Sequence, residues 1–176
     1  KAAQIVFDEG VGYPILLGDE NKINKSAEAN GIDLEGLPIF DPRSDAMEEK
    51  RNAYSELFFK KRGRKGFNAY EAKKVMKDRN YFGCMMVEFG DADAMISGLA
   101  KNYPDTIRPA LQTIGTEDGV KKIAGMYLML TKKGPLFLAD TTVNFNPTAE
   151  ELADITLMVA KEVRNFNIIP RIAMLS

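Results

Sequence analysis

Short apolar runs alternate with longer segments of helical periodicity along most of this chain. Apolar runs at residues 13–17 and 36–41 predict two strands, and a polar helix is expected between them, from about residue 19 to 30. Such alternation is typical of an α/β fold in which helices connect parallel strands. We therefore expect a three-layer sandwich with a mainly parallel sheet.

The same pattern continues through the rest of the chain. Helices are predicted over residues 45–61, 68–77 and 80–89, and strands over residues 123–131 and 136–139, joined in a hairpin. Thr148-x-x-Glu151 is a capping box, which predicts the start of a helix that carries Leu152, Ile155 and Val159 at helical spacing.

Both ends of the chain resemble the ends of an excised fragment. Residues 1–10 read as the second half of a helix that stops at Gly10, and residues 170–176 read as a strand that stops at its carboxyl end. We therefore expect truncation at both ends. Residues 1–116 would form a first α/β domain that lacks its N-terminal strand, and residues 117–176 would begin an incomplete second domain.

Composition excludes several classes of function. The chain has 24 basic and 25 acidic residues, so its overall charge favours neither nucleic acid nor membrane as a partner. A single cysteine, Cys84, in an apolar context favours an intracellular, cytoplasmic protein. The chain contains no histidine, which removes imidazole metal sites and Ser-His-Asp catalysis, and we expect no metal site in it.

Residues 91–111 form the first candidate site. Met95-Ile96 would end a strand, Ser97-Gly98 would turn the chain, and Asp105-Thr106 would cap a helix with Arg108 in its first turn. A helix N-terminus attracts anions, and a guanidinium adds a fork that suits phosphate. The alternative is an ordinary loop whose arginine pairs with one of the nearby aspartates.

Two other segments could bind a ligand. The basic run at residues 60–65 contains Arg62 and is either a phosphate-binding patch or a solvated helix end. Residues 140–147 lie between a predicted strand and the capped helix, where a ligand often binds. Asn144 could contact that ligand, or could satisfy the backbone of a turn.

Six segments, spread in order along almost the whole chain, resemble the phosphate acetyl/butyryltransferase family. The segments are residues 13–18, 80–87, 93–98, 105–111, 140–152 (at 140, 143–144 and 146–152) and 170–176. The resemblance implies a phosphotransacetylase-like fold and a cleft between two α/β domains that binds coenzyme A and acetyl phosphate. It also implies a homo-oligomer.

The resemblance also implies roles for particular residues. Arg62 and Arg108 match arginines of the family's ligand cleft, and we add Ser97, Thr106 and Asn144 as candidate ligand-binding residues. No catalytic residue is expected here, because the family's serine–arginine–aspartate segment would lie beyond residue 176. The hypothesis therefore depends on Arg62 and Arg108 converging on one hollow.

One departure from the family shapes the first hypothesis. Transferases of this family usually carry neighbouring hydroxyl residues before the arginine helix, whereas this chain has Asn102-Tyr103-Pro104. This segment looks most like the transferase-like C-terminal region of bacterial NADP-dependent malic enzymes. The first hypothesis is accordingly a regulatory region that binds acetyl-CoA or a related acyl-CoA or phosphate ligand. Its parent would oxidise malate to pyruvate with NADP and Mg²⁺ or Mn²⁺, and the fragment itself would be inactive.

Two alternatives remain at this stage. The chain could belong to a phosphate acetyltransferase, in which Arg108 stabilises charge on the reacting phosphate. It could also be an unrelated α/β domain whose arginines make only surface ion pairs.

Overall fold

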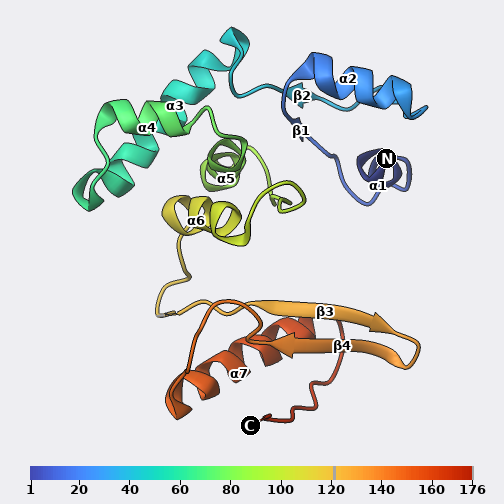
Figure 1. The fold of residues 1–176 in the computed structure, drawn as a ribbon, viewed down its shortest axis with the longest axis vertical. Coiled ribbons are helices and arrows are strands. Elements are labelled where there is room, and N and C mark those ends of the chain that lie inside the picture. Colours follow the sequence, from blue (N-terminus) through green and yellow to red (C-terminus); the bar gives the residue numbers. More distant parts are fainter. Residues whose placement is uncertain (121, 176) are drawn as a thin grey trace. The chain divides into compact units, whose positions relative to one another are not determined.

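The computed structural model describes residues 1–120 and 122–175, which divide into two compact units, Lys1–Gly115 and Thr116–Ser176 (Figure 1). Each unit is described by itself. The assignment of residues 1–116 and 117–176 to a first and an incomplete second transferase domain stays a prediction.

The first unit combines one small parallel sheet with a group of helices. Leu16 pairs with Ile39 and Leu17 with Phe40, so the two predicted strands exist, although each is only two residues long. In chain order, the elements are α1 (Ala2–Asp8), β1 (Leu16–Leu17), α2 (Glu20–Ala29), β2 (Ile39–Phe40), η1 (Asp45–Met47), α3 (Glu48–Arg62), η2 (Gly63–Lys65), α4 (Ala69–Val75), α5 (Arg79–Phe89) and α6 (Tyr103–Thr113).

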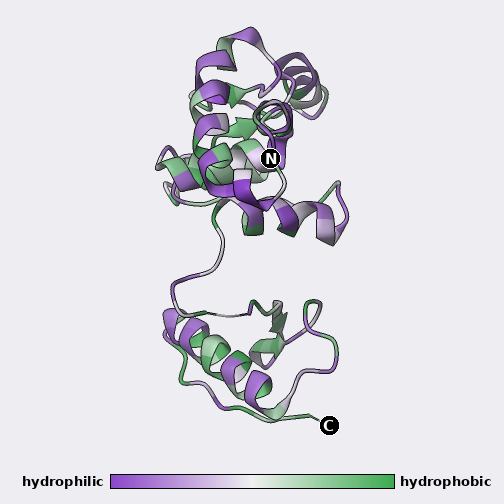
Figure 2. Ribbon diagram, turned by 90° about the vertical axis from the view of Figure 1, so that its left-hand side faces the viewer, coloured by the Kyte–Doolittle hydropathy of each residue, from purple (hydrophilic) through white to green (hydrophobic). Residues whose placement is uncertain are grey.

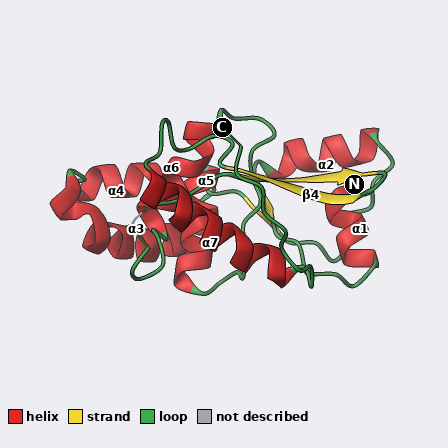
Figure 3. Cartoon of the chain, turned by 90° about the horizontal axis from the view of Figure 1, so that it is seen from below, coloured by secondary structure: helices red, strands yellow, loops and turns green. Residues whose placement is uncertain are grey.

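The core of the first unit lies among helices α3, α4 and α5. Tyr54 and Phe58 of α3 are fully buried, and the Tyr54 ring meets the Phe82 ring of α5 edge-on, with centroids 5.1 Å apart. Ala72 and Met76, Met85 and Met86 complete this buried cluster. Figure 3 shows how far helices predominate over strands in the chain. The helix predicted over residues 80–89 is α5, and its buried side chains form part of this core.

The segment between α5 and α6 differs from its prediction. Residues 91–102 contain no strand, since no neighbouring strand offers them a hydrogen-bonding ladder. Helix α6 begins at Tyr103 with Asn102 as its N-cap, so the expected cap at Asp105-Thr106 is wrong. Pro104 fits in the first turn because that turn needs no N–H donor from it. Arg108 consequently lies in the second turn of α6 and not in the first.

The second unit packs one long helix against a hairpin. Strands β3 (Met126–Thr131) and β4 (Gly134–Ala139) pair antiparallel, and α7 (Ala149–Asn165) opens with the predicted capping box of Thr148 and Glu151. Hydrophobic and hydrophilic bands alternate along α7 (Figure 2), and Ile155, Ala160 and Val163 are its buried residues.

The strand predicted over residues 170–176 is absent from its described part, residues 170–175, and residue 176 lies outside the described residues. No strand runs alongside this segment to pair with it.

The fold class is α/β, as predicted, with a parallel pair in the first unit and an antiparallel pair in the second. None of the helices described in residues 1–120 and 122–175 is both long enough and apolar enough to cross a bilayer.

Candidate functional site

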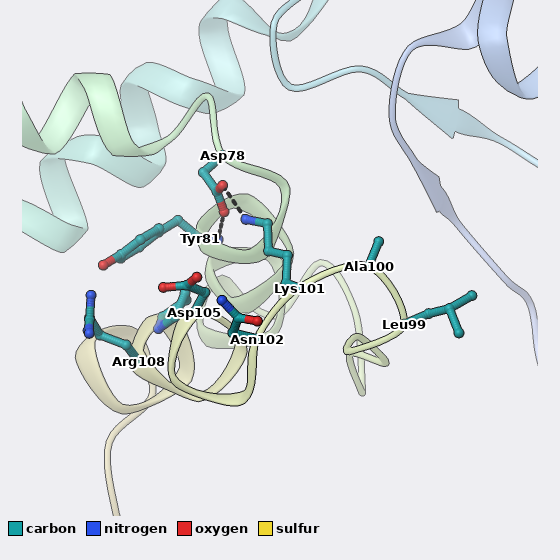
Figure 4. Close-up of a pocket in the computed structure, with 9 residues that line it drawn as sticks. Asp78, Tyr81, Leu99, Ala100, Lys101, Asn102, Asp105 and Arg108 are labelled. Carbon is teal, nitrogen blue, oxygen red and sulfur yellow. Dashed lines mark hydrogen bonds and ion pairs between the residues drawn. The ribbon is translucent and has the colours of Figure 1, made fainter.

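A hollow of about 590 Å³ opens in the first unit beside Arg108 (Figure 4). The start of α5, the second half of the 91–102 segment and the first two turns of α6 supply its walls. The lining residues are Asp78, Tyr81, Leu99, Ala100, Lys101, Asn102, Asp105, Arg108 and Pro109. Arg108 was predicted for this hollow, whereas Asp78, Tyr81 and Lys101 were not.

Asp78 anchors two walls of the hollow with one carboxylate. Its Oδ1 accepts hydrogen bonds from the backbone N–H groups of Asn80, at 2.8 Å, and Tyr81, at 3.4 Å, which caps α5. Its Oδ2 pairs with the Lys101 ammonium at 2.5 Å. Burial alone would raise the pKa of Asp78, but these hydrogen bonds and the Lys101 charge outweigh it and leave the pKa below its usual value. The pair therefore stays ionised and fixes the 91–102 segment to α5.

Tyr81 projects from α5 on the same side of the hollow as the Arg108 guanidinium (Figure 4), and its hydroxyl donates a hydrogen bond to the Gln112 side chain. Burial raises the pKa of the Tyr81 phenol, whereas the positive charges of Arg108 and Arg62 both lower it; the net pKa lies above its usual value. Arg108 lines the hollow together with Tyr81, whereas Arg62, at the end of α3, does not belong to its lining.

Neither arginine is neutralised by its surroundings. Arg62 is half-buried, and its Nε is a buried atom that finds no hydrogen-bond partner among the described residues. Arg108 is exposed and forms no ion pair within residues 1–120 and 122–175. Asp91, one of its expected partners, binds the Lys50 ammonium instead, at 2.6 Å. Cations that are held in place without a carboxylate are available to an anionic ligand.

Asn80 supplies a hydrogen-bond donor that Pro109 removes from α6. A proline inside a helix has no N–H for the carbonyl four residues earlier, here that of Asp105. The side-chain amide of buried Asn80 donates to this carbonyl at 3.2 Å, and its oxygen accepts the Ser97 hydroxyl at 2.8 Å. Asn80 thus ties α5, α6 and the 91–102 segment together. The sequence contained a signal for this, since a mid-helix proline predicts a carbonyl in need of another donor.

The other predicted residues, Arg62 among them, lie outside the lining of this hollow, so the expected convergence of Arg62 and Arg108 on it is not seen. Ser97 is hydrogen-bonded to Asn80, and the Thr106 hydroxyl donates to the Asn102 carbonyl at 3.2 Å within α6. Asn144 belongs to the second unit. Their roles as ligand-binding residues stay predictions.

The Asn144 side chain is held inside its own loop. Its Nδ2 donates to the Ile123 carbonyl at 2.8 Å and to Asp140 Oδ2 at 2.6 Å. The Asp140 carboxylate also accepts backbone N–H groups from Gly125, Thr142, Val143 and Asn144. Burial opposes ionisation of Asp140, yet these donors lower its pKa to about 2. The asparagine therefore satisfies a turn, as one of the two interpretations held.

No cluster of three or more potential metal ligands occurs in the part of the chain that the structure describes.

Solved structures of phosphotransacetylases share this fold. EutD phosphotransacetylase from Staphylococcus aureus superimposes with a TM-score of 0.86 at 30% identity, covering 99% of this chain and 52% of that one. A phosphotransacetylase from Streptococcus pyogenes gives a TM-score of 0.83 at 35% identity, covering 99% and 53%. The phosphotransacetylase-like fold predicted from the sequence is thereby confirmed.

The model of the family "Phosphate acetyl/butaryl transferase" matches residues 1–176, and the chain belongs to that family. It is 39% identical to a phosphate acetyltransferase from Nitratidesulfovibrio vulgaris, covering 100% of this chain and 25% of the relative. It is 38% identical to one from Bacillus subtilis, covering 100% and 58%. The chain therefore spans between a quarter and three-fifths of the length of these two relatives.

These findings correct the first hypothesis. Relatives that match the chain from end to end are phosphate acetyltransferases, so the interpretation as a regulatory region of an NADP-dependent malic enzyme is wrong. The oxidoreductase activity and the NADP expected with it have no support. The departure at Asn102-Tyr103-Pro104 was given too much weight, because three residues were set against similarity along the whole chain.

Proposed function

We propose that the protein containing this chain is a phosphate acetyltransferase, which moves an acetyl group between acetyl phosphate and coenzyme A. The observation that carries the proposal is the hollow lined by Arg108 and Tyr81, in which no carboxylate among the described residues forms an ion pair with the Arg108 guanidinium. Family membership and the named activity of the relatives support the same reaction.

In this reaction the coenzyme A thiolate attacks the acetyl carbonyl carbon, and the bond from that carbon to the phosphate oxygen breaks. Inorganic phosphate leaves with the electron pair of that bond. The leaving phosphate gains negative charge, which fixed guanidinium groups stabilise more in the transition state than in the ground state. Arg108 and Arg62 would supply this stabilisation.

The test is an assay of the full-length protein for acetyl-CoA formation from acetyl phosphate and coenzyme A. Losing one charge-assisted phosphate contact costs about 1.5–3 kcal/mol, so Arg108→Gln and Arg62→Gln should each lower kcat/KM by about 10- to 100-fold. Arg64→Gln is the matched control, because it removes an exposed arginine from the same basic run. Full activity in both variants, or no transfer by the wild-type protein, would refute the proposal.

Homo-oligomer formation and a cytoplasmic location accompany this proposal as predictions. Acyl-CoA and acetyl phosphate, expected as ligands from the sequence, become substrates under it.

A further inference from the structure

A second hollow, of about 550 Å³, lies in the first unit at the carboxyl ends of β1 and β2. Gly18 and Asp19 follow β1 directly, Asp41 follows β2, and all three line the hollow. The carboxyl ends of parallel strands meet at one edge of a sheet, where α/β proteins bind ligands most often. Position in the fold therefore makes this hollow a candidate site in its own right.

The charges around this hollow are unbalanced. Its basic lining residues are Lys1, Lys22, Arg43, Lys77, Arg79 and Lys101, and its acidic ones are Asp19, Asp41 and Asp78.

All three carboxylates are already engaged. Asp19 accepts the Lys22 backbone N–H at 3.0 Å as the cap of α2, and Asp41 accepts the Arg43 backbone N–H at 2.9 Å. Asp78 caps α5 and pairs with Lys101.

Four cations of this hollow have no partner among the described residues. Within residues 1–120 and 122–175, the side chains of Lys1, Arg43, Lys77 and Arg79 form no hydrogen bond and no ion pair. Arg43, Lys77 and Arg79 come from different segments, after β2 and around the start of α5. Six basic residues against three carboxylates leave the lining with a net positive charge, and binding an anion relieves the resulting repulsion.

Gly18 lets Arg79 pack closely against the end of β1. A Cβ atom at this position would lie 3.6 Å from Arg79 Nη1 and 3.2 Å from the Ile23 side chain, so a larger residue would press on both side chains. Arg79 lines the hollow and has no partner among the described residues, so its guanidinium can present paired N–H groups to two oxygens of one phosphate.

We propose that this hollow is a second phosphate-binding site, which takes a phosphate monoester or diphosphate group through Arg43, Lys77 and Arg79. Asp78 and Lys101 line both hollows, so their ion pair forms a wall common to the two. The phosphate could come from the nucleotide end of coenzyme A lying across that wall, or from a separate phosphorylated small molecule. The site does not depend on the proposed transfer reaction.

Calorimetric titration of the full-length protein with inorganic pyrophosphate tests the site. The titrations use an Arg108→Gln background, so that binding at the first hollow is weakened. Adding Arg79→Gln or Arg43→Gln should weaken pyrophosphate binding about tenfold or more, since each removes a charge-assisted contact. Arg164→Gln, which removes an exposed arginine of α7 in the second unit, is the matched control and should change the affinity less than twofold.

Equal affinity in the Arg79→Gln, Arg43→Gln and control variants would overturn the proposal, and so would a lack of pyrophosphate binding. Melting temperatures of the variants show that each remains folded.

A competition experiment identifies the source of the phosphate. Displacement of pyrophosphate by coenzyme A assigns the site to coenzyme A, and undisturbed binding assigns it to a separate phosphorylated molecule. Because the readout is binding, a failed transfer assay leaves this result unaffected.

Discussion

The Asp140 carboxylate organises the loop that follows β4, and one substitution tests its contribution. Asp140→Asn keeps the size of the side chain but weakens charge-assisted bonds from Gly125 and Asn144. We expect the second unit to lose about 1.5–3 kcal/mol of stability. Hydrogen-exchange mass spectrometry of residues 122–144 measures the loss. Asp154→Asn, at an exposed position in α7, should leave exchange unchanged.

The same carboxylate predicts an acid limit for the second unit. The pKa of folded Asp140 is about 2, below its unfolded value of about 4, so ionisation favours the folded state. This stabilisation is complete above about pH 4 and is lost as the pH falls toward 2. Urea unfolding followed between pH 5 and pH 2 should show a drop in stability that is smaller in Asp140→Asn, with the remainder due to other carboxylates of lowered pKa such as Glu151. A parallel drop in that variant would contradict the assignment.

At single positions, the sequence identified candidate ligand-binding arginines but not the residues that build the hollow around Arg108. Arg62 and Arg108 were singled out because a guanidinium near a helix end suits phosphate, and Arg108 lines the first hollow together with Tyr81. Asp78 and Lys101 were not, because they are about 20 residues apart in sequence and only the folded chain pairs them. Arg108 was also placed one helical turn too early, since Asp105-Thr106 and not Asn102 was taken as the cap of its helix.

Among the helices, α7 offers the cleanest test of a local signal. The Thr148 hydroxyl accepts the Glu151 backbone N–H at 3.3 Å, and the Glu151 carboxylate accepts the Thr148 N–H at 3.0 Å. Thr148→Ala should cost about 1 kcal/mol of stability. Thermal unfolding followed by circular dichroism measures it. Thr148→Ser retains the hydroxyl and should stay near the wild type, whereas equal losses in both variants would speak against capping.

Elements defined by local interactions were predicted well, and elements that need a distant partner were not. The capping box and the hairpin depend on residues within a few positions of one another, and both are present. Met95-Ile96 and residues 170–175 were predicted to lie in strands, but they pair with no strand of the described residues. Strand formation requires a neighbour's N–H and C=O groups, which composition does not supply.

The two units differ in how much apolar surface they bury. Fully buried side chains such as Tyr54, Phe58 and Met85 all belong to the first unit, whereas residues of the β3–β4 hairpin such as Leu130, 85% exposed, are largely uncovered. Backbone amides under a dense core exchange through larger, rarer openings. Hydrogen exchange should therefore be slowest in α3 and α5 and much faster in β3 and β4. Comparable protection of hairpin and core amides would show that other contacts cover the hairpin.

At the scale of the whole molecule, the family resemblance predicted the fold correctly, whereas one local difference from the family led to the wrong function. Matches spread over six segments predicted the phosphotransacetylase-like fold, which solved structures confirm. The regulatory hypothesis arose from the substituted residues 102–104 alone. These three residues are exposed at the start of α6, and exposed positions tolerate substitution, so their weight against a whole-chain match is small.

Cys84, the chain's single thiol, sits on α5 against Met95 of the 91–102 segment, with its sulfur 3.3 Å from the methionine sulfur. Burial raises the pKa of the thiol, although the Thr113 side chain of α6 acts in the opposite direction, so the folded protein protects the thiol from alkylation. The rate at which an alkylating reagent labels Cys84 therefore reports how often α5, α6 and the 91–102 segment separate. A ligand that holds these segments together would lower the labelling rate, and this can be measured without knowing what reaction the protein performs.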